Sequence, residues 1–149
     1  MNKTVKKRYQ ELKSRNSNYV REKKWESNVL LQECLLTLGN NKKILALEQQ
    51  KQILVRFNSV LPRLMDSNRK KSVQSVRELL PQWGNNPVYI IWDEESLPII
   101  KTDFESILVC IDDVIAVAFE TWITTMEMNQ FIQFSSRNKM IEITFEGSS

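Results

Sequence analysis

The spacing of apolar residues changes near residue 85, and this change constrains the fold more than any other feature of the chain. Up to residue 83 the apolar residues recur every three or four positions, as they do on one face of a helix. A turn-forming cluster, Trp-Gly-Asn-Asn-Pro, follows at residues 83–87. Continuous and alternating apolar runs, which are typical of strands, come after it. The pattern predicts an α+β chain in which N-terminal helices pack on a small, mainly antiparallel C-terminal sheet.

The helical part of the pattern divides into four segments. The first ends near residue 15, where the apolar spacing is interrupted by Ser and Asn residues. Gly39 is expected to stop the second helix and Pro62 the third. The four predicted helices span residues 5–15, 27–38, 47–61 and about 70–80. Asp66 or Ser67 could supply the start of the fourth helix.

The second part of the chain is expected to supply about four strands. Residues 88–92 form an apolar run that indicates a strand buried on both faces. Residues 114–123 are rich in β-branched and aromatic residues, and residues 129–145 alternate around a turn, as in a hairpin. Between these strands, Thr102 and Glu105 have the spacing of a capping box, which predicts a helix over residues 103–111.

The length of 149 residues predicts a single domain, because neither half alone would bury a sufficient core. The chain shows no signal-peptide pattern and no apolar run of membrane-spanning length, so a cytoplasmic location without membrane contact is expected. Cys34 and Cys110 lie among apolar residues, and we interpret them as buried thiols rather than as a disulfide.

Formal charge is distributed unevenly along the chain. Residues 1–83 contain 18 Lys and Arg against 7 Asp and Glu, whereas residues 84–149 contain 3 against 11. The net charges of the two parts are therefore +11 and −8. Such asymmetry favours two faces that interact with different surroundings.

The composition argues against catalysis. The chain has no His, which removes the commonest general base and the commonest zinc ligand, and its three Gly residues cannot form a phosphate-binding loop. The acidic runs at residues 93–95 and 112–113 could in principle bind Mg²⁺, but such runs are usually solvated loop residues. We expect neither enzymatic activity nor a metal or other cofactor.

Binding of nucleic acid to the basic part remains an alternative. Its basic residues cluster at positions 6–8, 21, 23–24, 42–43 and 69–71, where they could neutralise phosphates. No nucleic-acid-binding motif accompanies them, and the acidic part would repel a phosphate backbone. Nucleic acid is therefore the less favoured partner.

Four short segments of the second part resemble a known family. They read Val-Tyr-Ile-Ile-Trp-Asp at 88–93, Leu-Pro-Ile-Ile-Lys-Thr-Asp at 97–103, Ile-Asp-Asp-Val at 111–114 and Ala-Val-Ala-Phe-Glu-Thr-Trp-Ile at 116–123. In this order they resemble the immunity proteins of contact-dependent growth-inhibition systems, which accompany polymorphic bacterial toxins. The resemblance implies a protein that binds the C-terminal domain of one cognate toxin, most often a nuclease, and blocks its active or substrate-binding site.

An acidic surface would suit that function, because many nucleases bind their substrate in a basic cleft and complementary charge speeds encounter. The acidic residues of the second part are therefore the candidates for toxin binding, and the oligomeric state is left open. These candidates are Asp93, Glu94, Glu95, Asp103, Glu105, Asp112, Asp113 and Glu120.

Overall fold

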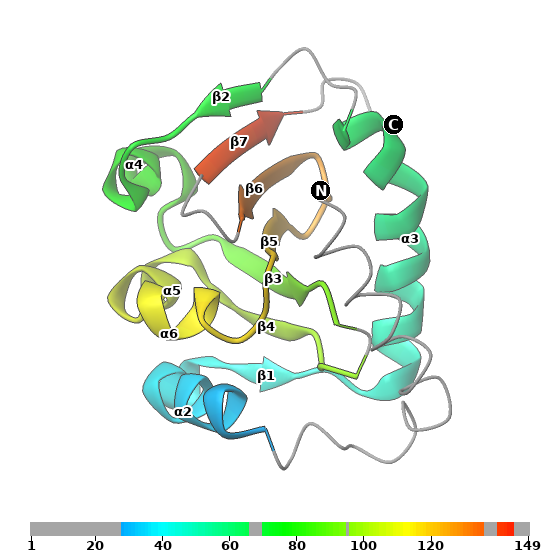
Figure 1. The fold of residues 1–149 in the computed structure, drawn as a ribbon, viewed down its shortest axis with the longest axis vertical. Coiled ribbons are helices and arrows are strands. Elements are labelled where there is room, and N and C mark those ends of the chain that lie inside the picture. Colours follow the sequence, from blue (N-terminus) through cyan, green and yellow to red (C-terminus); the bar gives the residue numbers. More distant parts are fainter. Residues whose placement is uncertain (1–27, 66–69, 95, 136–139, 145–149) are drawn as a thin grey trace.

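The computed structural model describes residues 28–65, 70–94, 96–135 and 140–144, which form a seven-stranded sheet with helices on both faces (Figure 1). Neighbouring strands are antiparallel throughout, in the order β1-β4-β3-β5-β6-β7-β2. This arrangement confirms the predicted α+β class. The strands are β1 (Lys43–Ile44), β2 (Lys70–Ser72), β3 (Pro87–Trp92), β4 (Ile100–Asp103), β5 (Thr121–Thr125), β6 (Gln130–Phe134) and β7 (Met140–Thr144).

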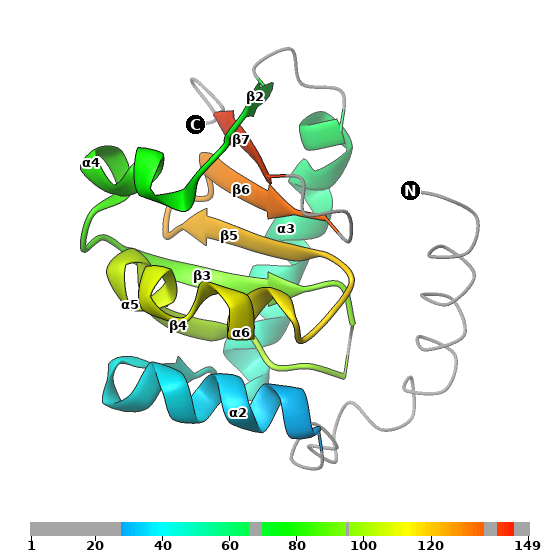
Figure 2. The same cartoon turned by 60° about the vertical axis from the view of Figure 1, so that its left-hand side comes forward.

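Helices cover both faces of the sheet, as Figure 2 shows. Among the described elements, the long helix α3 (Leu47–Met65) is the one that crosses the first face. The other face carries α2 (Val29–Leu38), α4 (Leu80–Trp83), α5 (Phe104–Val109) and α6 (Ile111–Ile115), together with the 3₁₀ turns Gly39–Asn41 and Val76–Leu79. We call α2, α5 and α6 the short-helix layer, because the three helices lie side by side on that face.

Strand β3 lies between β4 and β5 and confirms the prediction of a strand buried on both faces. Val88, Ile90 and Trp92 point into the core beneath the short-helix layer. Tyr89 and Ile91 point the other way, into the core beneath α3. The period-2 alternation of a strand explains why its apolar run is continuous.

Helix α2 matches the predicted helix over residues 27–38. The Asn28 side chain caps its first turn by accepting a hydrogen bond from the Leu31 amide at 3.0 Å. Gly39 ends the helix with φ 64°, a conformation that L residues rarely adopt. Four side chains of α2 are buried in the core, namely Leu31, Cys34, Leu35 and Leu38.

Helix α3 corrects the prediction that Pro62 ends the third helix, since it continues to Met65. Proline removes one intrahelical hydrogen bond. The last turn nevertheless carries Leu64, which is fully buried in the core against the sheet. We attribute the continuation of the helix to the burial of that side chain.

The predicted helix over residues 70–80 is wrong in its first part. Residues 70–72 form β2, which pairs with β7 and gives the sheet its last strand. A 3₁₀ turn follows, and the Ser75 hydroxyl caps it by accepting from the Arg77 amide at 3.2 Å. Pairing with the free edge of β7 overrides the local helical spacing, which the sequence alone could not anticipate.

Three further predictions also require correction. Residues 111–115, which overlap the predicted strand over 114–123, form α6, and the strand itself is confined to β5. The N-cap of α5 is Asp103 rather than Thr102, because Thr102 is paired within β4. The predicted strand number of about four becomes seven, since β1 and β2 come from the first part of the chain and flank the sheet.

The hairpin predicted over residues 129–145 is confirmed by β6 and β7. The predicted helix over residues 5–15 lies outside the described residues, as do Asp66 and Ser67. Within the described part of the chain, no helix is both long and apolar enough to cross a membrane.

Candidate functional site

Three of the predicted acidic residues lie at one end of β3, which we call the Trp92 end. Asp93 follows the strand, and its Oδ1 accepts a hydrogen bond from the Glu120 amide at 3.2 Å. The Asp93 amide in turn donates to the Glu120 carbonyl at 3.2 Å. Glu94 is half-buried beside them, whereas Glu95 lies outside the described residues.

Glu120 is an acidic candidate whose carboxyl resists ionisation. Burial raises its pKa above the ordinary value, and the nearby charge of Asp93 raises it further. The backbone hydrogen bonds between the two residues hold them together at the start of β5. The Trp92 end therefore holds one partly buried carboxyl group, that of Glu120, which ionises less readily than an exposed one.

Asp103 and Glu105 lie at the opposite end of β3, which we call the Pro87 end. Asp103 pairs with Pro87 in the sheet and caps α5, since its two carboxylate oxygens accept from the Ser106 amide at 2.8 Å and the Ser106 hydroxyl at 2.9 Å. Glu105 is exposed in the first turn of α5. Five residue steps along β3 separate the two ends, so the two acidic groups are about 17 Å apart.

Asp112 and Asp113 occupy the first turn of α6 within the short-helix layer. Asp113 is half-buried and accepts a hydrogen bond from the Thr37 hydroxyl of α2 at 3.1 Å. Asp112 is exposed. The contact with Thr37 fixes α6 beside α2, so the carboxylates of the two helices belong to one surface.

Charge differs between the short-helix layer and α3 more clearly than between the two halves of the sequence. The three helices of the short-helix layer contain no Lys or Arg, and their acidic residues are Glu33, Glu105, Asp112 and Asp113. Helix α3 on the other face carries Lys51, Arg56 and Arg63 against Glu48. Glu33 was not among the predicted candidates because its half of the chain is basic on average. The absence of basic residues from positions 28–41 is the local signal that would have identified it.

The described basic clusters do not gather into one surface. Lys43 lies in β1 and Lys70 and Lys71 lie in β2, which are the two edge strands of the sheet. Six strand spacings separate these edges, or about 29 Å. Lysine on a short edge strand also discourages pairing with another chain, which is a sufficient structural role for these residues.

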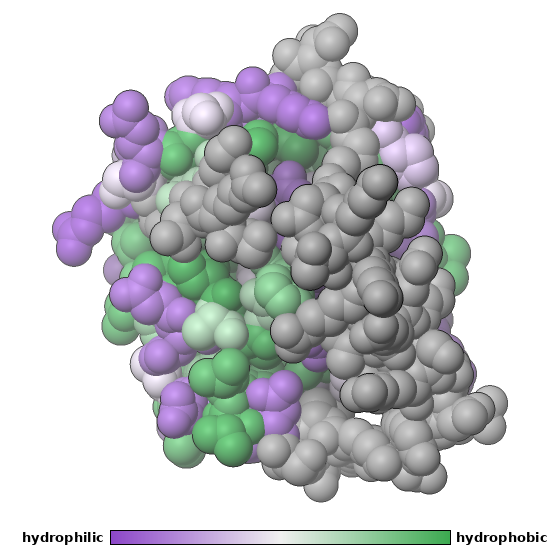
Figure 3. Space-filling model, viewed as in Figure 1, coloured by the Kyte–Doolittle hydropathy of each residue, from purple (hydrophilic) through white to green (hydrophobic). Residues whose placement is uncertain are grey.

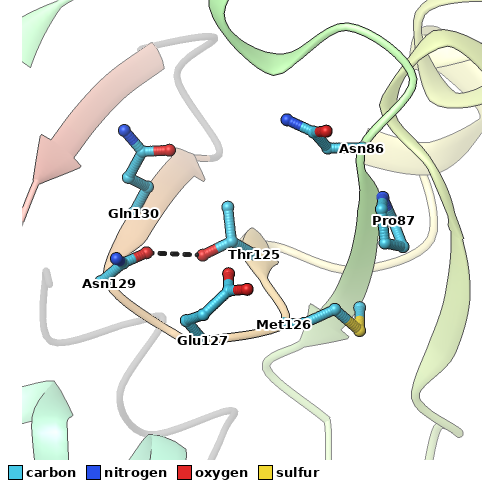
Figure 4. Close-up of a pocket in the computed structure, with 7 residues that line it drawn as sticks. All are labelled: Asn86, Pro87, Thr125, Met126, Glu127, Asn129 and Gln130. Carbon is cyan, nitrogen blue, oxygen red and sulfur yellow. Dashed lines mark hydrogen bonds between the residues drawn. The ribbon is translucent and has the colours of Figure 1, made fainter.

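A hollow of about 320 Å³ opens at the Pro87 end, where β3 begins and the turn between β5 and β6 passes (Figure 4). The Thr125 hydroxyl donates to the Asn129 side-chain oxygen at 2.9 Å across the turn. Glu127 is the single ionisable side chain of its lining, which therefore offers amides and hydroxyls rather than an acid–base pair. The residues that line it are Asn86, Pro87, Thr125, Met126, Glu127, Asn129 and Gln130.

The two cysteines are free and buried, as predicted. Burial, followed by the proximity of Cys110 and Asp113, raises the pKa of Cys34 to about 12. Burial and Asp113 also raise the pKa of Cys110. A thiol with a raised pKa is a poor nucleophile, so both residues serve the packing between α2 and the start of α6.

No group of three or more His, Cys, Asp or Glu side chains within the described ranges is arranged to hold a metal ion. The sequence matches the family model described as CdiI immunity protein, EcoliA0-like, over residues 28–144. A search of curated proteins gives no match to this sequence. The family match covers nearly all of the sheet and its helices, and the chain therefore belongs to the CdiI immunity proteins, which neutralise a cognate toxin of contact-dependent growth inhibition.

Proposed function

We propose that this immunity protein neutralises a nuclease toxin domain in the cytoplasm by covering its nucleic-acid-binding site with an acidic surface. The observation that carries the proposal is the difference in charge between the short-helix layer, whose three helices carry carboxylates but no Lys or Arg, and α3, which is mostly basic. Family membership supplies the toxin as the partner. The nuclease activity and the occlusion mechanism are the parts that we add.

The physical basis is electrostatic competition. A nuclease that neutralises several phosphates presents a basic cleft, and carboxylates placed over that cleft replace the phosphates. Glu105 and Asp112 are exposed and can approach such a cleft directly. Asp103 and Asp113 have hydrogen-bond partners within the protein, so they add negative potential to the surface rather than free ligands.

The acidic residues at the Trp92 end lie farther from this surface and add less to its negative electrostatic potential. Asp93, Glu94 and Glu120 lie about 17 Å from Asp103 along the sheet, which exceeds the Debye length of about 8 Å at physiological salt. We therefore assign toxin contact first to Glu105 and Asp112, with Glu33 added. The residues at the Trp92 end are assigned to the rim of the interface.

The test uses the cognate toxin domain, which is sought in the gene next to the gene for this chain. The purified domain is assayed for cleavage of DNA and RNA with increasing amounts of the full chain, and we expect inhibition to be complete at a one-to-one ratio. A catalytically inactive toxin variant is then loaded with a labelled oligonucleotide. Occlusion predicts that the chain displaces the oligonucleotide, whereas a ternary complex would show that inhibition acts elsewhere.

Direct nucleic-acid binding by the chain itself is measured in the same experiment. Lys43 lies on one edge of the sheet and Lys70 and Lys71 lie on the other, so we expect no binding of the oligonucleotide to the chain alone at low salt. Tight binding that weakens steeply with salt would instead favour the nucleic-acid alternative. Failure to inhibit the toxin and failure to protect cells would together reject the proposed function.

A further inference from the structure

Helix α2 exposes more apolar surface than a helix on one side of a sheet requires. Seven of its ten residues are apolar, and four of the seven are buried against the sheet. The remaining three face outward, with exposed fractions of 68% for Val29, 48% for Leu30 and 80% for Leu36. A helix with apolar residues on both its inner and its outer side is typical of burial on both sides, and the described residues cover only the inner side.

The exposed side chains form a line rather than a scatter. Val29 and Leu36 are seven residues apart, so they lie two turns apart on the same side of α2, about 10 Å from each other. That side points away from the sheet, opposite the buried Leu31 and Leu35. Leu30 shares its line with Thr37, whose hydroxyl contacts α6, and it therefore extends the apolar line toward α6.

Val109 adds a fourth apolar side chain to the same layer. It ends α5 with an exposed fraction of 81% and lines a shallow hollow with Asn41, which follows α2. Figure 3 shows apolar and hydrophilic surface mixed over the short-helix layer. Among the described residues, four of the five large exposed apolar side chains lie on this layer, and the fifth, Val55, lies on α3.

Acidic side chains surround these apolar residues. Glu33 lies between Val29 and Leu36 on the exposed side of α2, and the exposed Asp112 begins α6. Exposed apolar side chains with charged side chains beside them are a candidate protein–protein interface, in which a few residues supply most of the binding energy.

The charge of this surface selects its occupant. A second copy of the chain would bring two acidic surfaces together, and like charges in contact disfavour such a pair. Nucleic acid and an anionic membrane surface are repelled for the same reason. The partner that fits is a protein with a basic rim around an apolar depression.

We infer that Val29, Leu36 and Val109 anchor the toxin, while Glu33, Glu105 and Asp112 orient it. This inference rests on the proposed function, because the occupant is the same toxin domain. It adds that binding energy comes chiefly from the apolar anchors, and that α2 is the centre of the interface.

The test compares serine substitutions on the two helical faces. Val29→Ser combined with Leu36→Ser removes two anchors, and Val55→Ser is the matched control, because its exposed fraction of 69% is similar but it lies on α3. Circular dichroism and thermal melting establish that each variant folds as wild type does. Binding to the catalytically inactive toxin domain is measured by surface plasmon resonance, and protection is measured by co-expression.

We expect the double variant to bind at least tenfold more weakly, mainly through faster dissociation, and Val55→Ser to bind as wild type does. Val109→Ser is expected to weaken binding in the same way. Normal binding by the double variant, with wild type still neutralising the toxin, would overturn the anchors and leave the proposed function intact. A change from dimer to monomer in the double variant, with unchanged toxin binding, would show that a second copy occupies the surface and would also overturn the inference.

Discussion

Glu120 is a residue whose ionisation opposes folding. Burial raises its pKa, and so does neighbouring Asp93, which means that the folded protein holds this proton more tightly than the unfolded chain. The stabilisation due to Glu120 is therefore complete below the unfolded pKa of about 4.3 and is lost as pH rises through the folded pKa. At pH 7 we expect Glu120→Gln to be more stable than wild type, with a difference that shrinks as pH falls toward 4.

Urea denaturation of both proteins between pH 4 and pH 7 measures this difference. Asp112→Asn serves as the control, since Asp112 is exposed. A Glu120→Gln variant that is less stable than wild type by the same amount at every pH would contradict the prediction, because it would show that the carboxylate is stabilising.

The indole N–H groups of two buried tryptophans donate to different kinds of acceptor. Trp83 Nε1 donates to the carboxylate of Glu142 at 2.9 Å, and Trp92 Nε1 donates to the Val114 carbonyl at 3.0 Å. Replacement by Phe removes a similar part of the ring from each site. We expect the free energy of unfolding to fall by about 2–3 kcal/mol in Trp83→Phe and by about 1–2 kcal/mol in Trp92→Phe. A buried carboxylate left without its hydrogen-bond donor costs more than a carbonyl left without one.

Chemical denaturation measures the free energy of unfolding of both variants. Trp92→Ala sets the scale, at an expected loss of about 3–5 kcal/mol for removal of the whole side chain. Equal losses for the two Phe variants would show that the carboxylate of Glu142 finds another donor.

At the scale of elements, the end of α2 depends on one backbone conformation. Gly39 adopts φ 64° and ψ −139°, and a Cβ at this position would meet no atom within 4 Å. The cost of Gly39→Ala is therefore backbone strain alone, which we expect to be about 1–3 kcal/mol. The exposed Asn40→Ala is the control, and thermal unfolding is the measurement. Unchanged stability of Gly39→Ala would mean that α2 ends without the left-handed residue.

The elements that could be predicted are those whose local pattern agrees with their place in the sheet. Strand β3 has an apolar run because it is buried on both faces, and α2 has both an N-cap and a stopping glycine. Residues 70–72 have a helical spacing but lie beside the open edge of β7, so a distant partner decides their structure. In α6, Val114 has strand propensity, yet its carbonyl accepts from Trp92 and its side chain packs in the core beneath α2.

The candidate site could be predicted only in part, for a reason that belongs to the whole molecule. Charge counted along the chain separates residues 1–83 from residues 84–149, but the fold places α2 from the first part beside α6 from the second. Asp103, Glu105, Asp112 and Asp113 are brought onto one side of the sheet, whereas Asp93 and Glu120 lie at the other end of β3. The sequence alone does not show that Glu33, Val29 and Leu36 share a surface with these carboxylates, because that depends on how α2 packs on the sheet.

The charge distribution over the whole molecule predicts how the toxin approaches. A basic partner is attracted to the short-helix layer and repelled by α3, so reversal of rim charges changes the association rate more than the dissociation rate. We expect Glu105→Lys and Asp112→Lys together to slow association about tenfold at low salt and to flatten its salt dependence. Glu94→Lys, at the Trp92 end, should slow association less, and Lys51→Glu on α3 should leave it unchanged or slightly faster.

Stopped-flow association with the inactive toxin domain, repeated over a range of salt concentrations, measures all four variants and wild type. The anchors act after encounter, so Val29→Ser with Leu36→Ser should leave the association rate and its salt slope near wild type while accelerating dissociation. The two sets of variants thus separate steering by the rim from retention by the apolar centre. Slower association for Lys51→Glu, with no effect of reversal at Glu105 and Asp112, would place the toxin on the α3 face and assign the partner an acidic rather than a basic surface.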